Sequence, residues 1–513
     1  NLHRNPLCGR NFEYFSEDPL LSGKMSAAYV RGIQSQGVGV SVKHFMGNDQ
    51  EINRSENDSR IPVRALRELY LKNFEIAVRE SDPWTVMSSY NRTNGVFTQQ
   101  NFELLQTILR DEWGFNGIVM TDWGAKEGTV AAVHAGNDLM EPGTPVETQR
   151  IIAAVKDGSL SIADLDRNVR RMLEYIVKTP RFNGYKYSNN PDLKAHAERV
   201  RKAAADGMVL LKNDADVLPL AGVKNVALFG LNAYKSIAGG TGSGNVNKPY
   251  IRNIDEGLKA AGFVLDEKIC TLYKSYREYV NAENAIARVI PQEGLGGGGM
   301  FGEGVMAEMT VRPEVVQASV NGNDAAVIVI GRNAGEGDDR VLAGDFELTA
   351  AERNLITNVT NEYHLAGKKV IVVLNVGGVV ETASWKSLPD AILLAWTPGQ
   401  EVGNSVADIL TGKSNPSGKL SMTFPMAYLD IPSSKNFPYY KPRSSRGSRN
   451  PQPVKDYDYT DYAEGLNVGY RYFNTVGKEV SYPFGFGLSY TTFEYSAPVV
   501  KLAKDGTLSV SVT

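Results

Sequence analysis

Short apolar runs alternate with amphipathic segments along most of this chain, and this alternation constrains its fold more than any other feature. Apolar runs bounded by turn residues predict buried strands, and apolar residues at helical spacing predict helices. In the first part, the predicted strands are 38–42, 84–89, 117–121 and 138–140, and the predicted helices are 19–36, 62–78, 101–112, 129–135 and 165–177. The alternation is typical of parallel βα units and predicts an α/β fold class.

A closed (β/α)8 barrel has eight parallel strands, each followed by a helix. Residues 1–180 contain four predicted strands. We therefore expect residues 1–180 to be the C-terminal part of a (β/α)8-like barrel. The remaining strands are then irregular or lie in a missing N-terminal barrel segment upstream of Asn1.

A second alternating set begins beyond residues 181–212, which we interpret as a linker and a helix over 192–212. Its predicted strands are 226–229, 325–330, 370–374 and 392–396, and its predicted helices lie near 254–261, 349–363 and 402–410. This order predicts a doubly wound α/β sandwich over residues 213–425, interrupted by a glycine-rich insert at 294–304.

The C-terminal part of the chain has a different pattern. Residues 426–490 are predicted to be a long loop and connector, because residues 431–461 are rich in Pro, Ser, Arg and Tyr. In residues 491–513, apolar and polar residues begin to alternate at period two. This period predicts the first strands of an all-β domain.

Composition argues against several function classes. The net charge of −3 indicates no nucleic-acid partner, and the longest apolar runs are too short to span a membrane. Cys8 and Cys270 form neither a disulfide framework nor a zinc pattern, so no metal is expected. Residues 294–299 formally fit G-x-G-x-x-G, but they follow no predicted strand and open no predicted helix. No nucleotide cofactor is expected there.

A carboxylate follows the predicted strand at 117–121, and an aromatic residue follows the carboxylate. In α/β barrels, catalytic groups lie at the carboxyl ends of the strands, which is where Asp122 is expected. Trp123 would offer a sugar ring an apolar face, and Asp122 would place a charge near its anomeric carbon. The alternative is that Asp122 caps the helix that follows.

Seven segments spread over nearly the whole chain resemble the motifs of family 3 glycoside hydrolases, in the order that the family has them. These segments are Gly-Arg-Asn-Phe-Glu at 9–13, Lys-His-Phe at 43–45, Ser-Tyr-Asn at 89–91, Thr-Asp-Trp-Gly at 121–124, Val-Leu-Leu-Lys-Asn at 209–213, Asn-Pro-Ser-Gly-Lys-Leu at 415–420 and Tyr-Pro-Phe-Gly-Phe-Gly-Leu-Ser-Tyr at 482–490. The resemblance implies a barrel-like first domain, an α/β sandwich and a fibronectin-III-like third domain. It also implies retaining cleavage of β-linked sugars from non-reducing ends, and no cofactor.

The resemblance assigns two catalytic carboxyl groups, as retaining hydrolysis requires. By position, Asp122 matches the nucleophile of the family. The acid/base candidate is Glu336, in a glycine-flanked loop that leaves the predicted strand 325–330 at its carboxyl end. Asp338 and Asp339 compete for this role, and a solvated acidic turn is the structural alternative. As a general acid, Glu336 is expected to have a raised pKa.

The remaining site residues are substrate-binding candidates, which would orient the sugar ring. They are Arg10, Lys43, His44, Arg54, Tyr90, Trp123 and Ser243. The alternatives are surface ion pairs for the two arginines, ordinary packing for Tyr90, a core histidine for His44 and a plain flexible loop around Ser243. The pocket Asp that the family takes from the upstream part of the barrel is not found in this sequence.

The resemblance favours an exo-acting β-glucosidase, with a β-glucoside or a short β-glucan oligosaccharide as its substrate. The N-acetylglucosaminidases of the family carry a second His after a Lys-His-Phe stretch, whereas here Asn48 and Asp49 follow Gly47. Two alternatives stay open. The same residues fit a β-xylosidase, and the incomplete barrel fits a non-catalytic carbohydrate-binding fragment.

Overall fold

The computed structural model describes residues 1–124, 128–289, 306–438 and 458–513. In the first domain, a parallel sheet has the order β1-β3-β6 and is made of β1 (Ser41–Phe45), β3 (Thr85–Ser88) and β6 (Ile118–Met120). Strand β1 begins at Ser41 rather than at residue 38, because Gly37 turns the chain with φ +77° and leaves Val38 exposed. The strand predicted at 138–140 is a single parallel bridge between Met120 and Leu139.

Helices flank this small sheet. They are α1 (Pro19–Gln34), α2 (Val63–Ala65), α3 (Lys72–Ser81), α4 (Thr129–Ala135), α5 (Pro145–Asp157) and α6 (Ile162–Lys178). A π-helical turn, Leu66–Tyr70, joins α2 to α3, and the helix predicted at 101–112 is π-helical over Glu103–Glu112. The sequence interpretation missed α5, which Thr144 opens with a capping box.

The helix predicted at 192–212 is wrong only over its last five residues, 208–212. Helix α7 (Leu193–Gly207) ends at Gly207, and β7 (Val209–Asn213) follows as a strand antiparallel to β12 (Ala391–Leu394). Val209 and Leu210 are fully buried in this strand. The main-chain N–H and C=O groups are hydrogen-bonded here by pairing with a strand that is distant in sequence. Local periodicity does not reveal such pairing.

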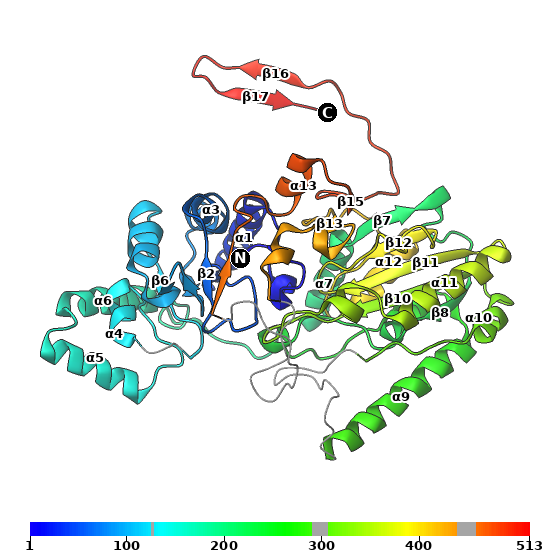
Figure 1. Ribbon diagram of the computed structural model, residues 1–513, viewed down its shortest axis with the longest axis horizontal. Helices are drawn as coiled ribbons and strands as arrows, with labels where there is room; N and C mark the ends of the chain where they lie inside the picture. Colours follow the sequence, from blue (N-terminus) through cyan, green and yellow to red (C-terminus); the bar gives the residue numbers. More distant parts are fainter. Residues whose placement is uncertain (125–127, 290–305, 439–457) are drawn as a thin grey trace.

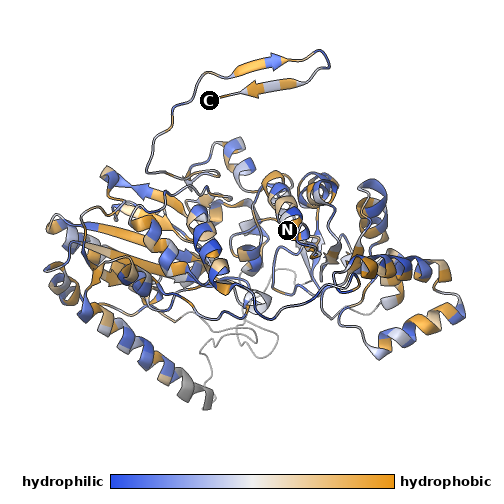
Figure 2. Ribbon diagram, turned by 180° about the vertical axis from the view of Figure 1, so that it is seen from behind, coloured by the Kyte–Doolittle hydropathy of each residue, from blue (hydrophilic) through white to orange (hydrophobic). Residues whose placement is uncertain are grey.

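The second domain is built on a six-stranded sheet with the order β7-β12-β11-β10-β8-β9. Its other strands are β8 (Asn225–Phe229), β9 (Val264–Leu265), β10 (Ala325–Arg332) and β11 (Lys369–Val376). Every residue of β10 is buried, as expected for a central parallel strand covered on both faces. Figure 2 shows the apolar strands of this sheet between layers of more polar helices.

Helices pack in two groups against this sheet (Figure 1). They are α8 (Ile254–Ala260), α9 (Glu267–Val289), α10 (Pro313–Val320), α11 (Ala350–Leu365) and α12 (Val402–Leu410). Helix α12 packs on α7 and α8, whereas α10 packs on α11, which contacts β10 and β11. The predicted doubly wound sandwich is confirmed. The sequence interpretation missed α9 and α10, and the glycine-rich insert at 294–304 lies outside the described residues.

The order of the strands creates a crevice at one point of the sheet. After β8 the chain moves to β9 on one side, and it then returns to β10 on the other side of β8. The carboxyl ends of β8 and β10 are therefore a topological switch point, where α/β sheets bind ligands. The loop after β10 reaches the first domain here, because Arg340 donates its main-chain N–H to the carbonyl of Leu7.

The C-terminal part returns to both domains. Strand β14 (Tyr459–Asp461) joins β2 (Asp58–Arg60), β4 (Arg92–Thr93) and β5 (Val96–Phe97) of the first domain, whereas β13 (Phe424–Pro425) pairs with β15 (Val480–Tyr482). Helix α13 (Tyr470–Val476) lies between them in sequence. The long loop predicted at 431–461 thus ends in a strand, and residues 439–457 lie outside the described ranges.

The last elements are β16 (Val499–Leu502) and β17 (Leu508–Ser511), which form an antiparallel hairpin. The hairpin stands apart from the body of the molecule, and all of its residues are exposed (Figure 1). A hairpin is consistent with the predicted start of an all-β domain, and the fibronectin-III-like assignment stays a prediction. Within the described ranges, no helix is long and apolar enough to cross a bilayer.

Candidate active site

Three predicted site residues lie at one edge of the first-domain sheet. Asp122 follows β6 after one residue, Tyr90 follows β3, and His44 lies near the end of β1. Because these parallel strands end at the same edge, the three side chains gather there. His44 Nε2 lies 3.7 Å from Asp122 Oδ2, and the Tyr90 hydroxyl is near enough to the Asp122 carboxylate to lower its pKa.

Asp122 is 8% exposed and is held from one side. Its Oδ1 accepts the Trp123 N–H at 2.7 Å. Its Oδ2 is buried and has no hydrogen-bond partner among the described residues, and His44 Nε2 lies 3.7 Å from it. Burial raises the pKa of the Asp122 carboxyl, and the Trp123 N–H and the nearby Tyr90 hydroxyl oppose this rise. One oxygen of a fixed carboxylate is therefore left for a ligand.

Glu336 reaches the same place from the second domain, in the loop after β10. Its Oε1 forms an ion pair with Arg54 Nη2 at 2.8 Å and lies 3.7 Å from Arg10 Nη1. Its Oε2 accepts the main-chain N–H of Ser243 at 3.0 Å. The predicted acid/base candidate thus lies at the domain interface, between two arginines of the first domain and a loop of its own domain.

The expected raised pKa of Glu336 is wrong for the ligand-free protein. Partial burial pushes this pKa upward, but the Ser243 hydrogen bonds and the charges of Arg10 and Arg54 outweigh it and lower the pKa to about 2. Glu336 is consequently ionised at neutral pH in this state. Its nearest cations are the two predicted sugar-binding arginines, so a ligand that engages them changes its charge environment.

The two arginines join the carboxyl groups into one polar cluster. The Arg54 guanidinium stacks 4.6 Å from the centre of the Tyr90 ring and donates from Nη1 to Glu51 Oε2 at 2.6 Å. Arg10 is 1% exposed and donates to Glu13. Neither arginine forms a surface ion pair, which was the alternative interpretation of the sequence.

Lys43 and His44 differ in their surroundings although they are neighbours. Lys43 is partly exposed, and its Nζ lies 3.9 Å from Glu13 Oε2. His44 is buried, and burial together with the charges of Arg10 and Lys43 lowers its pKa well below the ordinary value. A neutral imidazole beside Asp122 can donate a hydrogen bond but carries no charge at neutral pH.

Trp123 and Ser243 lie at the rim of this cluster. The Trp123 side chain is 66% exposed, which leaves its ring available to a ligand. Ser243 is exposed too, and it contacts Glu336 through its backbone N–H. The structure therefore brings seven predicted residues, Arg10, Lys43, His44, Arg54, Tyr90, Asp122 and Glu336, into one cluster, with Trp123 and Ser243 next to it.

Sequence reasoning missed Glu13 and Glu51, which hold the cationic side chains. It named Asp339 as a competing acid, but the Asp339 carboxylate accepts main-chain N–H groups of Gly9, Glu51 and Ile52. The polar run Asn48-Asp49-Gln50-Glu51 after a predicted strand was the available signal. No group of three or more His, Cys, Asp or Glu in the described ranges is arranged to hold a metal ion.

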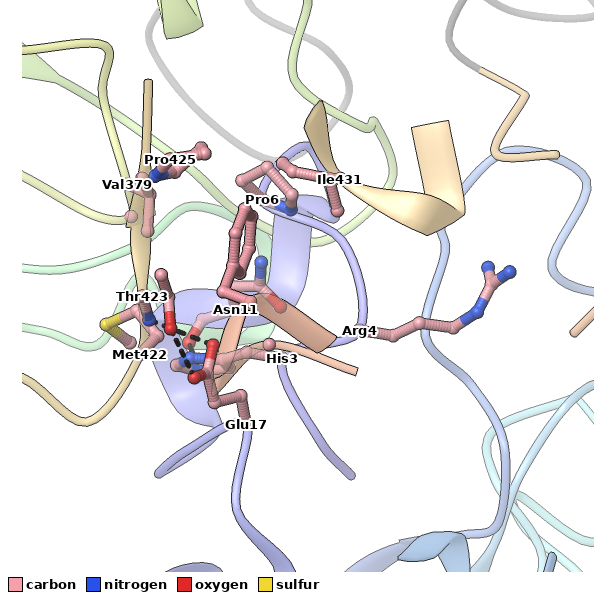
Figure 3. Close-up of a pocket in the computed structure, with 13 residues that line it drawn as sticks. His3, Arg4, Pro6, Asn11, Glu17, Val379, Met422, Thr423, Pro425 and Ile431 are labelled. Atoms are coloured by element: carbon pink, nitrogen blue, oxygen red, sulfur yellow. Dashed lines mark hydrogen bonds between the residues drawn. The ribbon is translucent and has the colours of Figure 1, made fainter. Parts of the chain in front are cut away.

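A separate cavity of about 30 Å³ lies between the N-terminal segment and the C-terminal part (Figure 3). Glu17 lines it and is buried there. Its Oε2 accepts the Thr423 N–H at 2.9 Å, and its Oε1 accepts the Thr423 hydroxyl at 2.7 Å and the Tyr470 N–H at 2.8 Å. Both oxygens of Glu17 are occupied by the protein, so this carboxylate joins chain segments rather than awaiting a ligand.

Comparison with known proteins identifies the family. The Glycosyl hydrolase family 3 C-terminal domain matches residues 208–490, and the Glycosyl hydrolase family 3 N terminal domain matches residues 1–175. The chain is 36% identical over 533 residues to an exo-alpha-(1->6)-L-arabinopyranosidase of Bifidobacterium longum, covering 100% of this chain and 62% of that protein. It is 37% identical over 503 residues to thermostable beta-glucosidase B of Acetivibrio thermocellus, covering 97% and 59%.

A solved structure is also similar along the entire chain. Beta-glucosidase 3B from Thermotoga neapolitana, in complex with glucose, superposes with a TM-score of 0.89 and 45% identity, and the match covers 100% of this chain and 69% of that protein. The chain spans about three fifths of the length of the two curated relatives. Its two matched domains lie in the order N-terminal, then C-terminal, and the chain belongs to glycosyl hydrolase family 3.

Proposed function

We propose that this protein is a retaining exo-acting β-glucosidase that hydrolyses terminal β-D-glucosyl residues by double displacement. The observation that carries the proposal is that two carboxyl groups, one from each domain, belong to one polar cluster at the domain interface. Asp122 has one unpaired oxygen, and Glu336 lies between Arg10 and Arg54. Retaining hydrolysis uses one carboxylate as nucleophile and a second carboxyl group as acid/base.

In the first displacement, Asp122 Oδ2 attacks the anomeric carbon and forms a glycosyl-enzyme ester, while the bond to the aglycone oxygen breaks. Glu336 supplies the proton that the leaving oxygen takes. In the second displacement, Glu336 removes a proton from water, whose oxygen attacks the same carbon and releases Asp122. His44, Tyr90 and the two arginines orient the sugar hydroxyls, which positions the anomeric carbon over Asp122.

Glu336 must hold a proton before the first displacement, although its pKa in the ligand-free protein is about 2. A bound sugar excludes water from the cluster and takes hydrogen bonds from Arg10 and Arg54. Both effects raise the pKa of a carboxyl group. We therefore assign the acid role to Glu336 in the substrate complex rather than in the free protein.

Two relatives define the alternatives for the substrate. The B. longum relative is named for an arabinopyranosidase, whereas the A. thermocellus relative is named for a β-glucosidase. A glucoside carries a hydroxymethyl group at C5 that arabinopyranosides and xylosides lack. An α-L-arabinopyranosidase is the second candidate, because one relative is named for that activity. A β-xylosidase is similar in this respect, since its pocket also needs no room for a hydroxymethyl group.

The test is hydrolysis of nitrophenyl β-D-glucoside, β-D-xyloside and α-L-arabinopyranoside by the protein, with Asp122→Asn as the control. We expect the highest kcat/KM on the glucoside and no turnover by Asp122→Asn. A higher kcat/KM on either pentoside would show that the protein prefers that pentoside, and the β-glucosidase assignment would be wrong. A folded protein that binds glucose but cleaves none of the three would support the carbohydrate-binding alternative.

A further inference from the structure

Two loops from different domains are fastened to each other beside the Arg54–Glu336 ion pair. The first loop, residues 46–57, follows β1, and the second, residues 333–340, follows β10. Each loop contributes one carboxyl group that accepts main-chain hydrogen bonds from the other loop, two at Asp339 and one at Glu51. The two carboxyl groups are Glu51 and Asp339, and we call this arrangement the carboxyl clasp.

Asp339 makes the bonds in one direction. Its Oδ1 accepts the N–H of Gly9 at 3.0 Å and that of Glu51 at 2.9 Å, and its Oδ2 accepts the N–H of Ile52 at 2.9 Å. The chains approach very closely here, because a Cβ on Gly9 would lie 2.0 Å from the Asp338 carbonyl oxygen. Three main-chain N–H groups of the first domain thus point at one carboxylate of the second.

Glu51 makes the bonds in the opposite direction. Its Oε2 accepts the Gly337 N–H at 2.8 Å and Arg54 Nη1 at 2.6 Å. Gly337 has φ +103°, a conformation that favours glycine, and it directly follows Glu336. The Glu51 side chain is fully buried, so these hydrogen bonds are shielded from water.

Glu51 therefore controls Glu336 by two routes. Through Gly337 it fixes the main chain one residue beyond Glu336. Through Arg54 it fixes the guanidinium whose other nitrogen, Nη2, lies 2.8 Å from Glu336 Oε1. One oxygen atom of Glu51 thus sets both ends of the Arg54–Glu336 pair, and Asp339 fixes the main chain at Glu51 itself.

We propose that Glu51 and Asp339 are positioning residues that hold Glu336 against the first domain in the geometry for proton transfer. The inference rests on the proposed function, because it assumes that Glu336 is the acid/base. It assigns no contact with the substrate to either residue. Without the clasp, the loop at 333–340 stays attached to β10, but its position relative to Asp122 is no longer fixed. Small displacements of a catalytic group lower the rate by large factors.

The groups that face Glu51 are Arg54, Arg10 and Asp339. Burial raises the pKa of Glu51 to about 8, although the two arginines oppose the rise. A neutral carboxyl group still accepts hydrogen bonds through its carbonyl oxygen. Glu51→Gln preserves such an oxygen, whereas Glu51→Ala removes the acceptor, so the two variants separate hydrogen bonding from charge.

The test compares kcat/KM for two β-glucosides, one with a dinitrophenolate leaving group and one with an alkoxide leaving group. A dinitrophenolate departs without a proton, and an alkoxide needs the acid. We expect Glu51→Ala to lose at least about tenfold more on the alkyl glucoside than on the dinitrophenyl glucoside, since general acid catalysis contributes about 10²–10⁴-fold. Glu51→Gln should stay close to wild type on both substrates.

A neighbouring carboxylate supplies a matched control. Glu56→Gln changes a partly exposed carboxylate in the same first loop. This control should keep the wild-type ratio between the two substrates. If Glu51→Ala does not fold, Asp339→Asn takes its place, because its single oxygen cannot accept all three N–H groups, and it should show the same selective loss.

The outcomes separate the clasp from the function on which it rests. If wild type cleaves neither substrate, the proposed function fails and the clasp with it. If wild type is active but Glu336→Ala loses equally on both substrates, Glu336 is not the acid, and the inference fails. If Glu336→Ala discriminates but Glu51→Ala, or Asp339→Asn in its place, loses equally on both or not at all, the clasp alone is overturned.

Discussion

The pKa values of Asp122 and Glu336 shift in opposite directions, although Arg10 and Arg54 lower both. Burial dominates at Asp122 and raises its pKa, whereas hydrogen bonds from Ser243 and the charges of Arg10 and Arg54 dominate at Glu336 and lower its pKa. At Glu336, Arg54 is in direct contact at 2.8 Å, and the Ser243 N–H adds a hydrogen bond at 3.0 Å. The chemistry therefore depends on how a sugar redistributes these contacts.

The pKa of Asp122 predicts the acid limb of the pH profile. A nucleophile must be ionised, so kcat/KM falls as pH falls through the pKa of Asp122, which lies above its ordinary value of 3.8. A dinitrophenyl β-glucoside isolates this limb, because its departure needs no acid. We expect the half-maximal rate above pH 3.8. A limb at or below that value would contradict the assignment of a buried nucleophile.

At the scale of the element, the loop that carries Glu336 depends on glycines. Gly242 has φ +69°, and a Cβ there would lie 2.4 Å from the Cβ of Glu336. Gly335 approaches Thr241 still more closely, with a Cβ position 1.8 Å from the Thr241 hydroxyl oxygen. Two loops of the second domain are thus packed against each other without room for a methyl group, which holds the main chain at Glu336.

Alanine at Gly242 tests this packing against a matched control. Gly367 has nearly the same backbone, φ +68°, but nothing lies within 4 Å of its Cβ position. Both Gly→Ala variants should lose about 1–2 kcal/mol of unfolding free energy from the left-handed backbone. Gly242→Ala alone should also lose activity on alkyl glucosides. Equal activity in the two variants would show that the contact with Glu336 does not matter.

The elements that the sequence predicted well are those with a strong local signal. Strand β10 is buried throughout, and its apolar run predicted it to within two residues. Helix α12 matches its predicted bounds. Strand β7 was predicted as part of a helix, because the residues on both sides of Gly207 are similarly apolar. Its partner strand, β12, is distant in sequence. Pairing between distant segments leaves no local periodicity to detect.

The site shows the same division. The strand ends predicted the places of His44, Tyr90 and Asp122, since parallel strands share an edge. Glu51 escaped prediction because its role comes from a Gly337 N–H in another domain. The lowered pKa of Glu336 escaped it for the same reason, because two arginines far away in sequence produce it. Sequence indicates which groups are present, and tertiary contact sets their charge.

At the scale of the whole molecule, buried polar contacts join the N-terminal segment to the C-terminal part. Arg4 is fully buried and pairs with Glu464 at 2.6 Å. Glu17 is bound by Thr423 and Tyr470 around the small cavity in Figure 3. Breaking a buried pair leaves an uncompensated charge, so these contacts hold the N-terminal segment against the part of the chain between Thr423 and Tyr470.

Glu17 makes stability depend on pH. Burial raises its pKa from 4.5 to about 7, against the hydrogen bonds from Thr423 and Tyr470. The folded protein thus holds a proton that the unfolded chain releases, so this contribution is complete below pH 4.5 and is lost as pH rises through 7. One such group changes the unfolding free energy by up to about 1.4 kcal/mol per pH unit.

Glu17→Gln should therefore flatten the fall of Tm between pH 5 and 7. Its absolute Tm at pH 5 should be lower, because an amide offers one acceptor oxygen in place of two. Glu314→Gln, which changes an exposed carboxylate, serves as the control and should keep the wild-type slope. An unchanged slope in Glu17→Gln would mean that Glu17 is ionised in the folded protein across this range.

The most direct test of the central claim, double displacement through Asp122, is mass spectrometry of the protein after reaction with an activated 2-deoxy-2-fluoro-β-glucoside. The fluorine slows the second displacement, so the glycosyl-enzyme ester accumulates. The account predicts one added sugar on the peptide that contains Asp122, and no label in Asp122→Asn. A label on another carboxylate, or steady turnover with no label, would contradict it.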